Sequence, residues 1–348
     1  MKPKRTMDFH KGGIKLEFYE SMFLVSSSEN MKILSSAIKN GGLKKSRYIL
    51  NMTVRSLYYN DSPEDEITYY EKILGIEGIV GMMTAADVNK ASFRQSGGVA
   101  VIATAGVSNA ATPGEKVEIW KNGTINILVI TENELTDEAM ANAIITTTEA
   151  KSLVFALLDI RSVNGGKQAT GTTTDCVAIA SLGKGECIRY TSSGTDIGRT
   201  IGRLVFECVL ESLMENNSLY FDRPIKKRLS ERKTDMEKNI ERVKEIFPIL
   251  SKINIDQLRK DDETIRYLYI SGLRALDEFQ NNGNASERAF LSCMGYIGKS
   301  IAENLGGRPS AKEYKCLIDD DLFKVAMLEE PILALDLGLL IGIKNGRC

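Results

Sequence analysis

The sequence predicts an α/β (or α+β) N-terminal domain with a mixed sheet, followed by an all-helical C-terminal domain. Up to about residue 216, short runs rich in β-branched residues alternate with segments of helical periodicity, whereas the remainder repeats apolar residues at helical spacing almost throughout. Between the two parts, residues 214–233 (MENNSLYFDRPIKKRLSERK) are polar, basic and interrupted by Pro224. A chain of 348 residues also suits two cores better than one. We therefore expect domains at residues 1–216 and 225–348.

Several segments of the first part have the composition of strands. They are GIKLEFYESMFLVSSS (13–28), RYILNMTV (47–54), GGVAVIATAGVSNA (97–110), GTINILVITE (123–132), CVAIAS (176–181) and ECIRYTS (186–192). The last two could form a hairpin closed by LGKG at residues 182–185. The order of the strands in the sheet does not follow from these patterns.

Helical patterns lie between and after these strands. Residues 135–158 can form a helix with Thr136 as its N-cap and Glu138 in its first turn, and a second helix follows Asp196 with apolar residues at helical spacing. In the second part, helices are expected within residues 237–250, 261–280 and 285–307. These helices carry no catalytic motif, which favours a bundle that serves packing or oligomerisation.

Composition excludes several classes of protein. The 45 basic and 46 acidic side chains nearly balance, so no global charge attracts nucleic acid or an anionic membrane. Scattered cysteines without a C-x-x-C pair argue against a zinc or iron–sulfur site and against disulfides. The basic N-terminus lacks an apolar continuation, and the apolar run at residues 331–343 is too short to span a bilayer and contains Asp336. We expect a cytoplasmic protein without membrane insertion.

The histidine content narrows the chemistry further. His10 is the only histidine, and it stands in the polar N-terminal arm. A Ser-His-Asp triad or a His-based zinc hydrolase would therefore depend on that one residue. An enzyme with this sequence more plausibly uses Asp, Glu, Lys, Tyr or Cys as acid and base.

Short motifs of glycine and polar residues recur along the first part, near the ends of the predicted strands. Each motif alone is most often turn chemistry, in which glycine adopts positive φ and Asn or Thr closes a local hydrogen bond. The motifs are NGGL (40–43), GMMTAAD (81–87), TAGVSNA (104–110), GTINI (123–127), TEAK (148–151), GTTTD (171–175) and GTDIGR (194–199).

Taken together and in this order, the motifs make residues 30–212 resemble the adenosylcobinamide amidohydrolase family of archaeal cobinamide salvage. The resemblance implies hydrolysis of the amide that joins the aminopropanol arm to the corrin ring of adenosylcobinamide, which yields adenosylcobyric acid and 1-amino-2-propanol. It implies no cofactor and no metal beyond the cobalt of the substrate. It does not extend to the helical part.

Asp175 is the first candidate for a catalytic role, because a carboxylate after a threonine turn could activate water or orient a threonine hydroxyl. Positions two apart on a helix do not share a face, so at most one of Glu149 and Lys151 should reach the site, and Glu149 is preferred as the second carboxylate. Thr174 completes the catalytic set. An alternative mechanism uses Thr172, Thr173 or Thr174 as a direct nucleophile.

The remaining candidates are expected to bind the substrate. Asparagine suits a corrin rim that carries many carboxamides, because its side chain both donates and accepts hydrogen bonds. The binding candidates are Asn40, Asn51, Thr84, Asn109, Asn126, Lys151, Thr172 and Thr195. Asp87, Asp175 and Asp196 could together form a magnesium site, but no known spacing of magnesium ligands matches these positions.

Two other functions remain open at this level. The chain could be a non-catalytic corrinoid carrier whose helices pass the ligand to a partner. It could also be a bifunctional enzyme with a C-terminal α-ribazole-phosphate phosphatase, for which clustered acids such as Asp319, Asp320 and Asp321 could hold a metal. No phosphatase motif matches those acids, so an accessory helical domain or homo-oligomerisation through the helices is favoured over a phosphatase.

Overall fold

The computed structural model of the chain divides into two compact units, Met1–Phe221 and Asp222–Cys348. It describes residues 1–9, 13–54, 61–117, 123–217, 225–252, 263–282, 287–306, 326–327, 330 and 332–345. His10 and the three acids at 319–321 lie outside these described residues.

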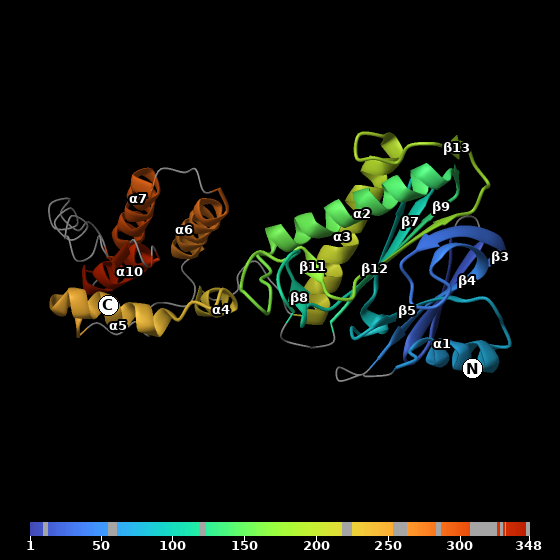
Figure 1. Ribbon diagram of the computed structural model, residues 1–348, viewed down its shortest axis with the longest axis horizontal. Helices are drawn as coiled ribbons and strands as arrows, with labels where there is room; N and C mark the ends of the chain where they lie inside the picture. Colours follow the sequence, from blue (N-terminus) through green and yellow to red (C-terminus); the bar gives the residue numbers. More distant parts are fainter. Residues whose placement is uncertain are drawn as a thin grey trace. The chain divides into compact units, whose positions relative to one another are not determined.

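The first unit combines strands and helices, as expected. Its elements are β1 (Arg5–Phe9), β2 (Ile14–Phe18), β3 (Met22–Ser35), β4 (Gly42–Thr53), α1 (Glu64–Leu74), β5 (Val80–Thr84), the 3-10 helix η1 (Val88–Lys90), β6 (Ser92–Ser96), β7 (Val99–Ala105), β8 (Ala110–Ala111), β9 (Ile125–Thr131), β10 (Glu134–Leu135), α2 (Asp137–Leu157), β11 (Gly171–Thr172), β12 (Cys176–Ser181), β13 (Cys187–Ile188) and α3 (Asp196–Asn217). Figure 1 shows these elements, with α2 and α3 beside the central strands.

The main sheet is mixed, which confirms the predicted class. Its strand order is β1-β2-β3-β12-β9-β7-β6, with β4 paired to β3 and β5 paired to β4; the β12–β9 and β4–β5 pairs are parallel and the rest antiparallel. The register between β3 and β4 shifts between Ser26 and Met31, where the long strand β3 changes its other neighbour from β2 to β12. Such an irregularity bends a strand and increases its twist.

The sheet curls until distant strands meet. In a flat sheet, β4 and β9 would lie three strand spacings apart, roughly 14 Å. The side chain of Asn126 on β9 nevertheless donates to Asn51 Oδ1 on β4 at 2.7 Å and to the Met83 carbonyl on β5 at 2.8 Å. The strands β4 and β5 therefore fold over the inner face of β9.

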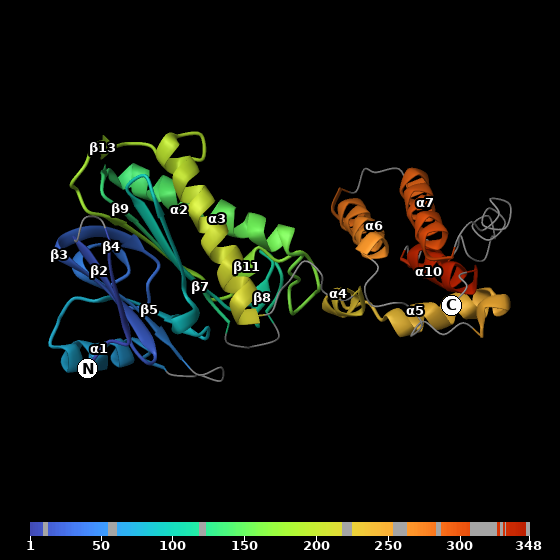
Figure 2. The same ribbon diagram turned by 180° about the vertical axis from the view of Figure 1, so that it is seen from behind.

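Alternating side chains cover both faces of the central strands. Val101, Ile127 and Val177 pack with α2 and α3, whereas Ile102 and Leu128 belong to the core inside the curl. Both faces are buried, which is why these strands read as nearly continuous apolar runs. Figure 2 shows α2 and α3 from behind, against the strands that include β7.

One expected connection is wrong. CVAIAS forms β12, but β12 pairs with β9 and β3, and ECIRYTS contributes only the short strand β13, which pairs in parallel with β10. As a central strand of the sheet, β12 has hydrogen-bonded neighbours on both of its edges, whereas the expected hairpin would give it a single partner.

The helices α2 and α3 begin as their sequences predict. The Thr136 hydroxyl accepts from the Ala139 N–H at 3.3 Å and caps α2, and α3 begins at Asp196. On α3, Ile201, Leu204 and Val205 are buried against the sheet, in agreement with the helical spacing. The helix continues to Asn217, a little further into the polar stretch than expected.

The second unit is helical over its described residues. Its elements are α4 (Ile225–Glu231), α5 (Met236–Ile246), the 3-10 helix η2 (Pro248–Leu250), α6 (Glu263–Asn282), α7 (Glu287–Gly306) and α10 (Leu333–Asn345). One apolar core joins them, and α10 contacts both α5 and α7. Most of the apolar run at residues 331–343 thus forms the buried helix α10, and Asp336 lies fully buried within it.

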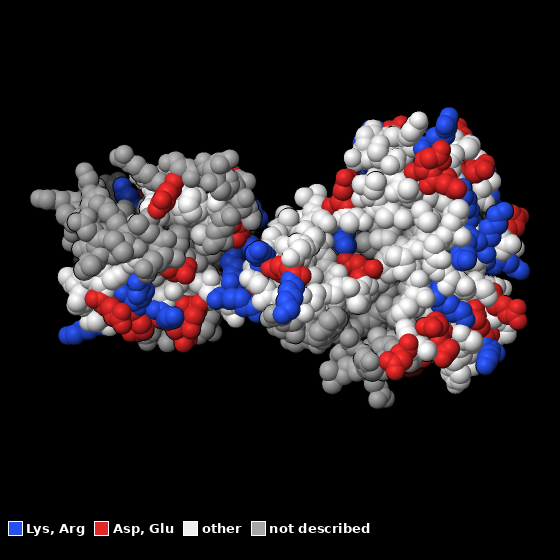
Figure 3. Space-filling view, in the orientation of Figure 1, with Lys and Arg blue, Asp and Glu red and all other residues white. Residues whose placement is uncertain are grey.

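Among the described residues, no helix combines the length and apolarity that crossing a membrane requires. On the face drawn in Figure 3, acidic and basic side chains are interspersed rather than gathered by sign. This distribution follows from the near balance of charges in the sequence.

Candidate active site

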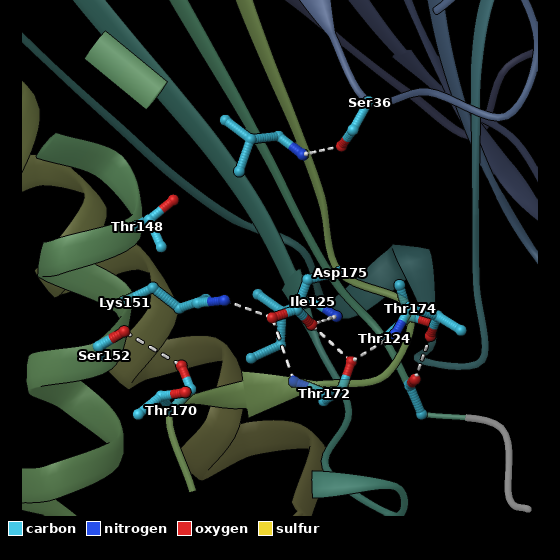
Figure 4. Close-up of polar contacts among 12 residues, drawn as sticks. Ser36, Thr124, Ile125, Thr148, Lys151, Ser152, Thr170, Thr172, Thr174 and Asp175 are labelled. Carbon is cyan, nitrogen blue, oxygen red and sulfur yellow. Dashed lines mark hydrogen bonds and ion pairs between the residues drawn. The ribbon is translucent and has the colours of Figure 1, made fainter. Parts of the chain in front are cut away.

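Asp175 stands immediately before β12 and makes contacts from both of its carboxylate oxygens. Oδ1 accepts from the Ile125 N–H at 3.1 Å and from the Thr172 hydroxyl, while Oδ2 accepts from the Thr172 N–H at 3.1 Å and from Lys151 Nζ. Figure 4 shows these groups converging on the carboxylate from β9, β11 and α2. Four donors fill the acceptor positions of the carboxylate.

The partner of Asp175 on α2 is Lys151. Their ion pair is largely sheltered, with 9% of the Lys151 side chain and 14% of the Asp175 side chain exposed. Asp175 shares the strand face of Val177, which is the face that α2 covers, so its carboxylate meets the helix. A lysine this buried requires a counter-charge, and Asp175 supplies it.

Glu149 lies on the exposed side of the same helix. The structure therefore brings Lys151, and not the preferred Glu149, to Asp175. Positions 149 and 151 do not share a face of α2, and Lys151 is the one that faces Asp175. A buried carboxylate favours a cation over a second carboxylate as its neighbour.

Gly171 leaves room for this ion pair. A β-carbon at this position would lie 2.3 Å from Asp175 Oδ2 and 2.6 Å from Lys151 Nζ. The glycine of GTTTD is therefore required by close approach of the two charged groups. This is a stronger constraint than the turn chemistry that the motif alone suggests.

The other threonines of the motif make a neighbouring set of contacts. The Thr174 hydroxyl donates to the Gly123 carbonyl and contacts the Thr124 hydroxyl, each at 2.7 Å. The Thr173 hydroxyl accepts from Asn109 Nδ2 at 2.7 Å. Asn109 is 1% exposed, and its Oδ1 has no hydrogen-bond partner among the residues that the structure describes. A buried acceptor without a partner is uncommon and is a candidate contact for a bound ligand.

Two of the predicted binding residues lie on the other face of the sheet. Asn51 donates to Thr104 Oγ1 at 3.0 Å and accepts from Asn126 at 2.7 Å, inside the curl. Asn126 follows Ile125 directly, but alternation turns its side chain away from Asp175. Thr84 is also fully buried, and its hydroxyl accepts from the Ala86 N–H at 3.0 Å. Asn126, Asn51 and Thr104 thus form an internal polar chain, separate from the Asp175 cluster.

The remaining predicted residues make structural contacts. Asn40 adopts a φ of 54° in the connection between β3 and β4, and its side chain donates to the Ile79 carbonyl, which precedes β5, at 2.8 Å. Thr195 accepts from the Gly198 N–H at 3.0 Å at the start of α3. Asp87 caps η1, and Asp196 pairs with Arg199.

The cysteine beside Asp175 is poorly suited to act as a nucleophile. Burial raises the pKa of the Cys176 thiol to about 11, and the Asp175 charge adds to this effect. The thiolate is the reactive form of cysteine, and a pKa this high leaves almost none of it at neutral pH.

Sequence reasoning missed three groups of the site: the Ile125 N–H, the Thr124 hydroxyl and the space at Gly171. Thr124 belongs to the GTINI motif, but the amide side chain of Asn126 is the more evident candidate for substrate binding in that motif. A backbone donor has no sequence signal at all. The position of Ile125 opposite Asp175 could be read only from the parallel pairing of β9 with β12.

Comparison with known proteins identifies the family of the chain. A model of the adenosylcobinamide amidohydrolase family matches residues 8–220, which is more than half of the chain. The first unit therefore has the fold of a family of amide-cleaving enzymes. The chain belongs to the adenosylcobinamide amidohydrolase family.

Three relatives are similar to the chain, and two of them are named as adenosylcobinamide amidohydrolases. The chain is 35% identical over 142 residues to an adenosylcobinamide amidohydrolase of Methanosarcina mazei, covering 40% of this chain and 65% of the relative. It is 30% identical over 170 residues to one of Halobacterium salinarum, covering 46% of this chain and 70% of the relative. An uncharacterized protein of Methanocaldococcus jannaschii is 44% identical over 98 residues, which cover 28% of this chain and 38% of that protein. The chain thus spans less than two thirds of the length of two of these relatives.

Proposed function

We propose that the first unit hydrolyses the amide between the aminopropanol arm and the corrin ring of adenosylcobinamide, releasing 1-amino-2-propanol and adenosylcobyric acid. Family membership and two relatives with this activity in their names support the substrate class. The observation that carries the proposal is the Lys151–Asp175 pair, which puts a base and a charged donor beside several hydroxyls.

Each requirement of amide hydrolysis has a candidate here. Asp175 can take the proton of the attacking group. Lys151 is a buried ammonium that can stabilise negative charge on the carbonyl oxygen or protonate the departing amine. Asn109 offers an unpartnered oxygen that can accept from an amide N–H of the substrate. Glu149 is left out of this proposal because it is exposed.

The first test is release of 1-amino-2-propanol from adenosylcobinamide under reducing, anaerobic conditions at several pH values. A corrinoid carrier would bind the same ligand and return it intact. We expect release by the full chain. Bound but unchanged adenosylcobinamide at every pH would favour the carrier.

Asp175→Asn tests the assigned carboxylate. We expect hydrolysis to fall at least about 1,000-fold, the scale on which enzymes lose a catalytic base. The variant also leaves Lys151 buried without a counter-charge, which can cost roughly 3–5 kcal/mol of stability. Asp175→Asn is therefore expected to lose stability as well as activity.

A double variant separates the two effects. Lys151→Met with Asp175→Asn removes both charges, so thermal unfolding should return toward that of the parent while hydrolysis stays lost. Lys244→Met, which removes a lysine paired with Glu241 on the surface of α5, is the matched control for loss of a lysine. Near-parental hydrolysis by the stable double variant would contradict the assignment.

A further inference from the structure

The three threonines of the GTTTD motif differ in what their hydroxyls contact. Only the Thr172 hydroxyl donates to the Asp175 carboxylate. The Thr173 hydroxyl accepts from Asn109, and the Thr174 hydroxyl donates to the Gly123 carbonyl at 2.7 Å. Thr172 is half-buried, so the residue is sheltered by the fold and still partly exposed to solvent.

The contacts around the Thr172 oxygen suit an attacking alkoxide. Its proton points to Asp175 Oδ1, and the Thr174 N–H approaches the same oxygen at 3.4 Å. The backbone donor would stabilise negative charge as the proton leaves. Thr172 therefore has both a proton acceptor and a donor for the developing charge.

Asp175 is held in place as a base for that hydroxyl. The Ile125 N–H and the Thr172 N–H each donate to it at 3.1 Å, and Lys151 pairs with Oδ2. Among these partners, Thr172 supplies the one hydroxyl, and a hydroxyl becomes a nucleophile by giving its proton to a base such as the carboxylate. A nucleophile bonded to a base, which a third group orients, is the arrangement typical of covalent catalysis.

We propose that Thr172 is the nucleophile and that the reaction passes through an ester between Thr172 and the corrin carboxyl group. This proposal rests on the proposed amidohydrolase function. The Thr172 oxygen bonds to the amide carbon, its proton passes to Asp175, and the carbonyl oxygen takes the negative charge. Collapse breaks the carbon–nitrogen bond, and the amine leaves with the proton from Asp175.

Water completes the cycle. It attacks the ester carbon and gives a proton to Asp175, and the Thr172 oxygen departs with that proton. The net change is amide plus water to acid plus 1-amino-2-propanol, with Thr172 and Asp175 regenerated. Lys151 contributes its positive charge beside the carboxylate during both halves.

Hydroxylamine tests the ester directly, because it attacks esters and would divert the corrin acyl group to a hydroxamate. With the full chain and adenosylcobinamide, we expect hydroxamate to rise with hydroxylamine concentration while less acid than 1-amino-2-propanol is formed. Thr172→Ser should give both products within about tenfold of the parent, because it keeps the hydroxyl. Thr172→Ala should lose at least about 1,000-fold in amine release.

The matched control is Thr200→Val, which removes a hydroxyl that donates to the Asp196 carbonyl within α3. Near-parental amine release by folded Thr172→Ala would overturn the proposal. So would equal amounts of acid and amine from the parent at every hydroxylamine concentration, with no hydroxamate. In both cases the parent still releases the amine, so the amidohydrolase function would stand; a parent that releases no amine would instead refute the function.

Discussion

At the scale of single residues, the candidate site depends on close approach as much as on chemistry. Asp175, Lys151 and Thr172 supply the functional groups, but the absent side chain at Gly171 lets them meet. The same reasoning applies at Gly123, where a β-carbon would lie 2.4 Å from Asn109 Oδ1. The two glycines thus belong to the site although they contribute no reactive atom.

Gly171→Ala should separate Lys151 from Asp175. The added methyl group would overlap both charged groups, so we expect hydrolysis to fall about 100-fold, as misplacement of catalytic groups by an ångström can do. Initial rates of 1-amino-2-propanol release check this. Gly194→Ala is the control, because a β-carbon there has no heavy atom within 4 Å. Equal rates for the two variants would show that the ion pair tolerates displacement.

At the scale of elements, the glycine positions of α3 show how closely this helix packs against its neighbours. A β-carbon at Gly202 would lie 3.6 Å from Thr146 Cγ2 on α2, an ordinary contact. Gly202→Ala should therefore raise the free energy of unfolding by roughly 0.5–1 kcal/mol, because alanine loses less backbone freedom in a helix than glycine. Urea unfolding followed by circular dichroism measures the change.

Gly198 on the same helix is the opposite case. A β-carbon there would lie 1.9 Å from the Ser192 carbonyl oxygen, so Gly198→Ala should destabilise the protein. If both alanine variants stabilised the protein equally, the position of the 191–195 loop against α3 would need revision.

At the scale of the whole molecule, the second unit contains a buried acid that links stability to pH. Asp336 on α10 is fully buried and accepts from the Tyr269 hydroxyl on α6. Burial raises the pKa of Asp336 to about 7, and Glu330 adds to this, while the hydrogen bond from Tyr269 opposes it. The unfolded chain would have an ordinary pKa near 4.

The sign of the effect follows from these two pKa values. Below about pH 4 the carboxyl is protonated in both states, and stability is at its full value. As the pH rises from about 4 to about 7, the unfolded chain releases this proton, whereas the folded state must retain it or bury a charge. The free energy of unfolding therefore falls by roughly 4 kcal/mol over this range. Asp336→Asn should flatten this dependence and increase protection near pH 8, because asparagine accepts from Tyr269 without a charge.

Hydrogen exchange of α10 peptides between pH 4 and 8, corrected for intrinsic exchange, measures this effect within the full chain. Glu278→Gln, at an exposed position on α6, is the control. Protection that falls with pH equally in the parent and in Asp336→Asn would rule out Asp336 as its source.

The sequence by itself determined the fold class, the cap of α2 and the family, because these depend on local patterns and on motif order. The motif GTTTD also led directly to Asp175. Tertiary structure alone decided that Lys151 rather than Glu149 meets Asp175, and that Asn51 and Asn126 lie on the opposite face of the sheet. The reason is physical: strand pairing and curl choose which side chains share a face, and neither register nor curl is encoded within a single local segment.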